Sequence, residues 1–225
     1  MARAVNVTIN WLPYTLDIPS YLGSARVGKR DNRVEAGSDD RSPAQWNAVR
    51  YAYMDARRYA ALREPAPPTI FGTQKIWNSA LAAVAMLWVR RLAAAAAAPA
   101  EAAAVWARFN DALWPAFWRR ELDIEDPAVL AGVVRAAGLP TEGFAAFVAE
   151  GGPGFEEYLL LQREAVARGV FGVPTYCLED AVGGAKAYWG REHLNLIRLR
   201  LFEQGYGRQG ARTLVDSPHV WSASS

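Results

Sequence analysis

One short apolar segment, residues 169–178, interrupts a chain whose hydrophobic residues otherwise recur mostly at helical spacing. The segment reads Gly-Val-Phe-Gly-Val-Pro-Thr-Tyr-Cys-Leu, and its β-branched and aromatic side chains are typical of a loop that leads into a buried strand. A pair of glycines then predicts a hairpin turn over 179–185, followed by a strand at 186–189 and a helix over about 190–204. This order of elements predicts an α/β layer fold that carries a helical insertion.

The N-terminal half supplies the remaining elements. Apolar and polar side chains alternate over residues 5–11, which predicts a half-buried strand that Pro13 ends. Residues 17–41 are rich in Gly, Pro, Ser and charge and predict a long loop. Prolines and polar capping residues, among them Asp126 and Thr141, then predict successive helices. These cover about 42–63, 74–98, 100–119, 127–137, 141–150 and 154–168.

Charge and hydropathy exclude several classes of protein. The 225 residues carry 25 Lys+Arg against 23 Asp+Glu, a net charge of +2 with histidine neutral, which is too balanced for a dedicated nucleic-acid or membrane-surface binder. No uncharged apolar run reaches the roughly 18 residues that could span a bilayer. The N-terminus also lacks the apolar region of a secretory signal. We therefore expect a soluble, cytoplasmic protein without nucleic-acid or membrane partners.

The single cysteine, Cys177, limits the chemistry further. One cysteine excludes an intramolecular disulfide, a two-cysteine redox cycle and a Cys-rich zinc site. The two histidines are far apart in the sequence, so we expect no metal site. Because Cys177 lies inside the predicted strand, we expect it to be buried as a small apolar residue.

Two features near the predicted hairpin leave alternatives open. Val173-Pro174 stands at the strand entrance, where a cis bond would turn the Val173 N–H and C=O outward for an extended, peptide-like ligand. A trans proline that merely begins the strand is the alternative. Glu192 lies in the first turn of the last helix, where it either interacts with the helix dipole or accepts a ligand's ammonium group. The adjacent His193 is expected to be a surface histidine.

Taken together, the 169–175 segment, the hairpin and Trp189-Gly-Arg-Glu-His-Leu194 resemble the C-terminal ββα unit of DsbA-like thioredoxin-fold proteins. Within that group the chain is most similar to 2-hydroxychromene-2-carboxylate isomerases and kappa-class glutathione transferases. Residues 11–16 resemble the end of the family's second strand and its W-x-P-F-x-L turn. Tyr51-x3-Asp-x2-Arg-Tyr-Ala60 resembles a helix signature of the inserted domain.

The resemblance implies a glutathione site. The family pairs the residue before a cis proline with the glutathione backbone, which assigns this role to Val173 beside Pro174. The acid that meets the γ-glutamyl end corresponds to Glu192, although the family usually has Asp-Arg where this chain has Glu192-His193. The implied reaction is the addition of the glutathione thiolate to a conjugated carboxylate substrate and its later departure. The implied partner is a small-molecule aromatic carboxylate or a thiol substrate. Arginines would hold the substrate carboxylates.

The resemblance also implies a domain organisation. Residues 1–16 and 169–204 would form the thioredoxin-like part, 42–168 the helical insertion, 17–41 a loop and 205–225 a disordered tail. Family members begin with a strand and a helix that carry a Ser or Cys-x-x-Cys, whereas only residues 1–4 precede the apparent second strand here. The resemblance therefore assigns no catalytic residue, and we expect the chain to lack the first strand and helix through a truncated start. The alternative is that the two remaining strands close up or recruit a partner strand.

Three functional hypotheses follow. The first is an enzyme-family protein that retains the proline half of a glutathione-dependent isomerase site. The second is a non-catalytic module that binds a thiol peptide or a protein strand. The third is a mostly helical scaffold with an incidental hairpin. An exposed sheet edge and apolar helix surfaces are also consistent with a homodimer.

Overall fold

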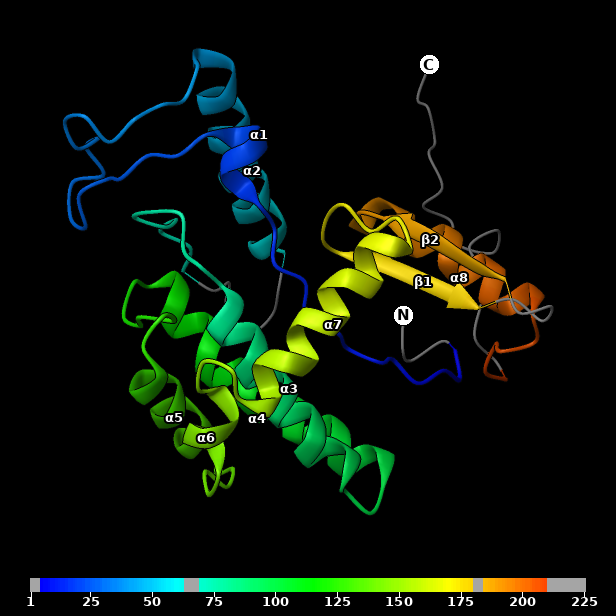
Figure 1. The fold of residues 1–225 in the computed structure, drawn as a ribbon. Coiled ribbons are helices and arrows are strands. Elements are labelled where there is room, and N and C mark those ends of the chain that lie inside the picture. Colours follow the sequence, from blue (N-terminus) through cyan, green and yellow to red (C-terminus); the bar gives the residue numbers. More distant parts are fainter. Residues whose placement is uncertain (1–4, 63–68, 180–183, 210–225) are drawn as a thin grey trace, which may run out of the picture. The chain divides into compact units, whose positions relative to one another are not determined.

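The computed structural model describes residues 5–62, 69–179 and 184–209 and shows a mixed α/β chain (Figure 1). The elements in chain order are α1 (Ile18–Leu22), α2 (Pro43–Ala60), α3 (Ala80–Ala94), α4 (Pro99–Trp118), α5 (Pro127–Ala136), α6 (Phe144–Val148), α7 (Pro153–Ala167), β1 (Thr175–Glu179), β2 (Ala185–Trp189), the 3-10 turn η1 (Arg191–His193) and α8 (Leu194–Glu203). The chain divides into two compact units. Unit 1 comprises Met1–Trp11 and Glu164–Ser225, and unit 2 comprises Leu12–Arg163.

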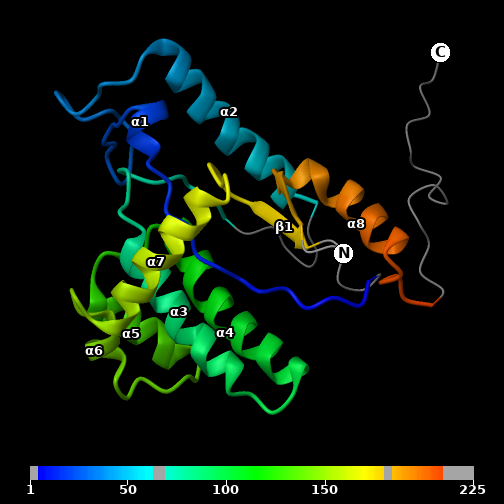
Figure 2. The same ribbon diagram turned by 45° about the vertical axis from the view of Figure 1, so that its right-hand side comes forward.

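The larger hydrophobic core lies in unit 2, where α3 and α4 pack side by side and α5 and α6 cover them (Figures 1 and 2). Helix α4 buries one residue in every turn, because positions four apart lie on the same helix face. These residues are Val105, Phe109, Leu113 and Phe117. Helix α3 is buried on more than one side, and the first half of α7 adds Tyr158 to the same core.

Helix α2 begins where the sequence predicts. The Ser42 hydroxyl accepts from the Gln45 N–H, while the Gln45 side chain accepts from the Ser42 N–H, so the two residues form a capping box ahead of Pro43. At the other end, Arg57 Nε donates to the Ile70 carbonyl at 2.9 Å and the Tyr53 hydroxyl lies 3.2 Å from Thr73 Oγ1. Helix α2 is thus hydrogen-bonded to the segment that precedes α3.

The predicted loop over 17–41 has more structure than its composition indicates. Helix α1 lies within it, and Val27 and Val34 form an antiparallel bridge. The side chains of Asp40 and Ser38 accept hydrogen bonds across the loop. Ser24 donates both its N–H and its hydroxyl to Asp40, and the Arg26 N–H donates to the Ser38 hydroxyl at 3.1 Å. The hydrogen bonds that the Ser24 N–H and hydroxyl donate to the Asp40 carboxylate lower the pKa of Asp40. Polar side chains here accept hydrogen bonds from backbone N–H groups that would be paired within a strand or helix in regular secondary structure.

Arg120 holds this loop from the interior of unit 2. It is buried, and its backbone has a left-handed φ of 63°. Its guanidinium donates to the Gly72 carbonyl at 2.8 Å, the Lys29 carbonyl at 2.7 Å and Asn32 Oδ1 at 2.5 Å, with a longer contact to the Phe71 carbonyl. All these acceptors are neutral oxygens. Arg120 therefore connects the loop after α1, the segment before α3 and the end of α4.

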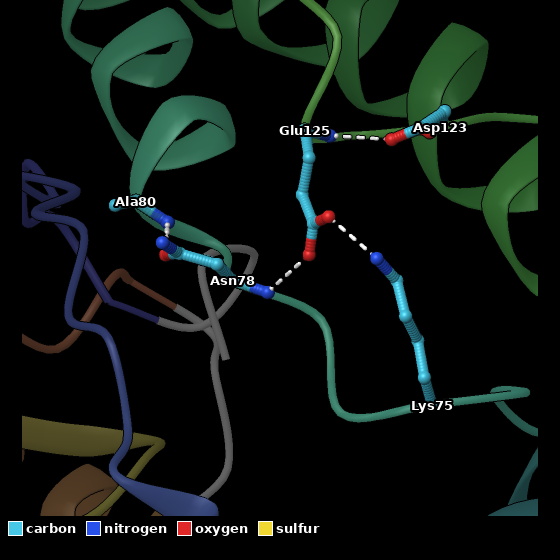
Figure 3. A network of polar contacts seen from close by, with 5 residues as sticks. All are labelled: Lys75, Asn78, Ala80, Asp123 and Glu125. Atoms are coloured by element: carbon cyan, nitrogen blue, oxygen red, sulfur yellow. Dashed lines mark hydrogen bonds and ion pairs between the residues drawn. The ribbon is translucent and has the colours of Figure 1, made fainter. Parts of the chain in front are cut away.

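Helix α3 starts later than predicted, at Ala80 instead of near residue 74, and a polar network joins the non-helical residues 75–78 to Glu125 (Figure 3). Lys75 Nζ lies 2.5 Å from one carboxylate oxygen of Glu125, and the Asn78 N–H donates to the other at 2.7 Å. The Asn78 side chain then accepts from the Ala80 N–H at 3.0 Å. Glu125 thus accepts from a backbone N–H that precedes the helix, and Asn78 accepts from the N–H of its first residue.

The Glu125 network predicts a loss of stability in acid. Burial raises the pKa of Glu125, but the hydrogen bonds from Lys75 and the Asn78 N–H outweigh it, so the pKa lies below its ordinary 4.5. A carboxyl group whose pKa falls on folding stabilises the native state above its unfolded pKa, and this contribution disappears as the pH falls from about 4.5 through the folded value. We expect Glu125→Gln to lower the urea midpoint at pH 7, with the difference from wild type shrinking toward pH 3. An equal difference at both values would contradict this role.

Two of the shorter helices test the predicted caps. Asp126 accepts from the Ala128 and Val129 N–H groups and caps α5, as the sequence predicts. The predicted Thr141 cap of α6 is wrong. The helix begins after Gly143, whose φ of 78° reverses the chain, and the Thr141 carbonyl instead accepts from the Phe144 N–H.

The backbone of α7 lies very close to core side chains at Gly154. A Cβ at this position would lie 2.6 Å from the Phe147 carbonyl oxygen, the Phe147 ring and Val84 Cγ1. Alanine normally stabilises a helix by roughly 1 kcal/mol relative to glycine. Here we expect Gly154→Ala to lower the free energy of unfolding by about 1–3 kcal/mol, because the core would be overpacked.

Gly132 in α5 is the matched control for this substitution. A Cβ at Gly132 would meet nothing within 4 Å. Gly132→Ala should therefore raise the free energy of unfolding by about 0.5–1 kcal/mol in the same urea titration. Equal effects of the two substitutions would contradict the packing argument.

Unit 1 is built around a two-stranded antiparallel sheet, as the hairpin pattern predicts. Thr175 pairs with Trp189 and Glu179 with Ala185. Helix α8 packs on one face of the sheet, where Ile197 and Leu201 are buried with Val5 against Tyr176, Leu178 and Tyr188. Residues 180–183 of the predicted turn lie outside the described residues.

The predicted strand over 5–11 is wrong for most of its length. Only Val5 forms a bridge, with Gly207, and the Asn6 N–H donates to the Tyr206 carbonyl at 2.8 Å. The side chains of Ile9 and Trp11 are about half exposed. The alternating pattern is present, but a strand also needs a ladder partner, and residues 8–11 have none among the described residues.

The prediction of a disordered tail from residue 205 is wrong for its described beginning. Gly205 has a φ of 84° and ends α8, and the Tyr206 N–H donates to the Leu201 carbonyl at 2.9 Å, which is the Schellman arrangement. Gly207 then pairs with Val5, and Arg208 Nε donates to the Val5 carbonyl. Residues 210–225 of the predicted tail lie outside the described residues. No described helix is both long and apolar enough to cross a membrane.

Candidate functional site

The segment before β1 is anchored by the end of α7. The Gly169 φ of 78° reverses the chain, and the Val170 N–H donates to the Ala165 carbonyl at 2.9 Å. Further on, the Thr175 hydroxyl donates to the Gly172 carbonyl at 2.6 Å. The peptide bond between Val173 and Pro174 is cis. Backbone and side-chain hydrogen bonds thus fix the chain on both sides of Val173.

The ladder shows which backbone groups of β1 point away from β2. The Gly190 N–H donates to the Pro174 carbonyl at 2.9 Å, so Pro174 and Gly190 form a hydrogen-bonded pair. Hydrogen-bonded pairs alternate with non-hydrogen-bonded pairs in an antiparallel ladder. The N–H and C=O groups of Thr175, Cys177 and Glu179 therefore face the outer edge of β1. No strand pairs with that edge within the part of the chain that the structure describes.

Val173 continues this outer edge toward the N-terminal side. Its side chain is 47% exposed. Its backbone N–H and C=O make no hydrogen bond to any described residue. Val173 therefore presents one donor and one acceptor to solvent, as an extended peptide would require for pairing.

The Glu192 carboxylate packs closely against Gly190, which is hydrogen-bonded to Pro174. A Cβ at Gly190 would lie 2.4 Å from both carboxylate oxygens of Glu192, and Gly190 has a φ of 96°. Since Gly190 is paired with Pro174, the Glu192 carboxylate is folded back toward the start of β1. Burial and the negative charge of Glu192 raise the pKa of Tyr176 above 10.0. The carboxylate has no hydrogen-bond or ion-pair partner among the described side chains.

Trp189 and Phe171 flank this site with apolar surface. A Cβ at Gly172 would lie 2.3 Å from Trp189 Nε1, so the indole covers Gly172. The ring centroids of Phe171 and Trp189 are 5.0 Å apart, and these side chains are 68% and 48% exposed. We call Phe171, Val173, Pro174, Trp189 and Glu192 the β1-entrance site.

The structure thus brings together the three residues predicted for the site, Val173, Pro174 and Glu192. The sequence motifs did not indicate the contributions of Phe171, Gly172, Trp189 and Gly190. The two glycines are the signal that could have indicated them. Gly172 lies between Phe171 and Val173, Gly190 follows Trp189, and at both glycines only the absence of a Cβ permits the observed contact.

Two expectations about neighbouring residues are wrong. Cys177 is exposed, because it points to the sheet face opposite to the one that Tyr176 and Leu178 turn toward α8. His193 is half-buried beside the Tyr188 ring at 6.1 Å, and its Nδ1 is buried without a hydrogen-bond partner in the described structure. No group of three metal-binding side chains occurs in the described residues.

Comparison with known proteins agrees with this architecture. A family model described as a DSBA-like thioredoxin domain matches residues 75–202, more than half of the 225-residue chain. The match includes α3 to α7, both strands, all of α8 but its last residue, and every residue of the β1-entrance site. No curated protein and no solved structure matches the chain. The mixed architecture of helices and a small sheet is consistent with a thioredoxin-like fold that carries a helical insertion, and the chain belongs to the family of DSBA-like thioredoxin domains.

Proposed function

We propose that this DsbA-like chain, a member of a thiol oxidoreductase and isomerase family, binds glutathione at the β1-entrance site and is related to glutathione-dependent 2-hydroxychromene-2-carboxylate isomerases. The observation that carries the proposal is the position of the Glu192 carboxylate, which is folded over Gly190 beside Pro174 and has no cationic partner among the described residues. A carboxylate in this state is suited to a ligand's ammonium group.

The neighbouring groups fit the rest of a tripeptide. The Val173 N–H and C=O are available for two hydrogen bonds to the backbone of the cysteinyl unit. Glu192 would bind the ammonium group of the γ-glutamyl unit. Phe171 and Trp189 would exclude water from one side of the bound peptide. In the proposed reaction the glutathione sulfur forms a bond to a conjugated carboxylate substrate, a carbon–carbon bond rotates, and the same carbon–sulfur bond breaks, so no net oxidation occurs.

Isothermal titration with glutathione tests the binding step. A charge-assisted hydrogen bond contributes roughly 1.5–3 kcal/mol, so Glu192→Gln should weaken glutathione binding about tenfold or more. The matched control is Glu164→Gln, which removes an exposed acid from α7 in the same unit and should leave the Kd unchanged. Equal affinities of wild type and Glu192→Gln would contradict the assignment.

A second ligand separates Glu192 from the rest of the site. The dipeptide Cys-Gly lacks the γ-glutamyl unit but retains the thiol and one peptide bond. If Glu192 binds the γ-glutamyl ammonium group, Glu192→Gln should lose affinity for glutathione but change the affinity for Cys-Gly by less than about twofold.

The alternative function is a non-catalytic module for an extended thiol peptide or a protein strand. The outward N–H and C=O groups of Thr175, Cys177 and Glu179 favour it, because they continue the edge that Val173 begins. A strand added along this edge would protect the amides of residues 175, 177 and 179 from hydrogen exchange. Glutathione is too short to protect residue 179, so the exchange pattern distinguishes the two functions.

A further inference from the structure

A cluster of cations occupies the turn between α1 and α2, in unit 2 and apart from the β1-entrance residues in sequence. Residues 26–33, here called the basic turn, read Arg-Val-Gly-Lys-Arg-Asp-Asn-Arg. The side chains of Arg26, Lys29, Arg30 and Arg33 are all exposed. In Figure 1 the blue loop that contains them extends away from α1 and α2.

Backbone hydrogen bonds hold the basic turn in one conformation. The Gly28 N–H donates to the Arg33 carbonyl at 2.9 Å, and the Glu35 N–H donates to the Arg26 carbonyl at 3.0 Å. The Val27 N–H donates to the Gln74 carbonyl at 2.8 Å, which attaches the turn to the segment before α3. A preordered surface loses less conformational entropy when a partner binds.

Arg120 supports the turn from the protein interior. It donates to the Lys29 carbonyl and to Asn32 Oδ1, and Asn32 itself has a left-handed φ of 56°. A buried arginine and two non-glycine residues with positive φ are costly features for a simple surface loop. The neutral acceptors of Arg120 leave its charge uncompensated, so it adds to the positive potential of the turn.

Nearby acids neutralise the cations only in part. Arg26 interacts electrostatically with Glu125. Within the turn, Asp31 lies 4.0 Å from Arg33, and both side chains are more than half exposed. Asp40 accepts from Ser24, and Asp39 accepts from the Arg41 N–H and from Trp46 Nε1. The described structure gives Lys29 and Arg30 no acidic partner.

We propose that the basic turn docks an acidic peptide segment of a partner protein. Guanidinium and ammonium groups bind carboxylates through charge-assisted hydrogen bonds. The turn has no aromatic side chain on which nucleic-acid bases could stack, and no aromatic or long aliphatic side chain that could enter a membrane. A projecting turn also matches an extended segment better than a small molecule, which requires a concave site.

Fluorescence anisotropy with a fluorescein-labelled hexaglutamate peptide tests the proposal on the full chain. Binding should be measurable at 50 mM salt and weaker at 150 mM salt. Lys29→Ala combined with Arg30→Ala should weaken it roughly fivefold or more. The matched control combines Arg108→Ala with Arg163→Ala, which removes the same charge from exposed positions on α4 and α7 and should change binding less than twofold.

A third variant separates the shape of the turn from its charge. Asn32→Gly keeps every charge and suits the positive φ, but removes the side-chain acceptor of Arg120. It should speed amide exchange over residues 28–33 and weaken peptide binding about twofold to threefold. The proposal is overturned by no binding at 50 mM salt, by equal losses in the two double variants, or by tighter binding to phosphatidylserine vesicles or single-stranded DNA than to the peptide.

Discussion

Replacing Arg120 by methionine should lower the free energy of unfolding by about 2–4 kcal/mol, a large effect for a single polar side chain. Methionine keeps much of the side-chain volume but leaves the Gly72 and Lys29 carbonyls and Asn32 Oδ1 without their donor. The buried Gly72 carbonyl that loses its hydrogen bond costs roughly 1–3 kcal/mol, and the partly buried acceptors at Lys29 and Asn32 each cost less. Urea titration followed by circular dichroism measures the change.

The adjacent Arg119 provides the control for Arg120. Its guanidinium is exposed and pairs with Glu121 at 2.7 Å. Surface ion pairs contribute little, so Arg119→Met should change the free energy of unfolding by less than about 1 kcal/mol. Arg120→Lys should fall between the two, since one ammonium group cannot replace a planar fork with several donors. Similar stabilities of Arg119→Met and Arg120→Met would show that the buried hydrogen bonds do not hold the loop.

Replacing Ile197 by alanine should unfold unit 1 locally while unit 2 remains folded. The buried hydrophobic core of unit 1 among the described residues consists of Val5, Ile197 and Leu201, and Ile197 is 2% exposed. Truncating such a residue costs about 2–5 kcal/mol. A two-stranded sheet is only marginally stable by itself, so β1 and β2 depend on this contact with α8.

Hydrogen exchange measured by mass spectrometry distinguishes local from global unfolding of the Ile197→Ala variant. Amides of β1, β2 and α8 should lose protection, while those of α3 and α4 retain it. Leu113→Ala, at a fully buried position of unit 2, should produce the reverse pattern. Uniform loss of protection across both units in either variant would contradict independent cores.

The candidate site could be predicted only in outline. Val173, Pro174 and Glu192 were recognisable because each belongs to a short motif, and the ladder bond between Pro174 and Gly190 brings those motifs together. The contacts of Trp189 with Gly172 and of Glu192 with Gly190 depend on side-chain directions across the hairpin. Sequence spacing gives no such directions when the register and the backbone turn are unknown.

The features of the fold that could be predicted are likewise those that depend on residues close together in the sequence. The Ser42 capping box, the Asp126 cap, the prolines that open helices and the hairpin strands were predictable, because each depends on residues within a few positions of one another. The predictions of a strand over 5–11 and of a buried Cys177 were wrong. The first required a partner strand and the second a covered sheet face, and a local sequence pattern shows neither.

The sequence by itself therefore determined the positions of most helices, the hairpin and the family to which the chain belongs. Only the tertiary structure decided that Arg120 joins three distant segments, that Val5 pairs with Gly207, and that the Glu192 carboxylate is folded beside Pro174. The physical reason is the difference in sequence separation over which these interactions act. Capping, helix propensity and turn preference act over about four residues, whereas hydrogen-bond satisfaction in the interior joins groups that only the folded chain brings within about 3 Å.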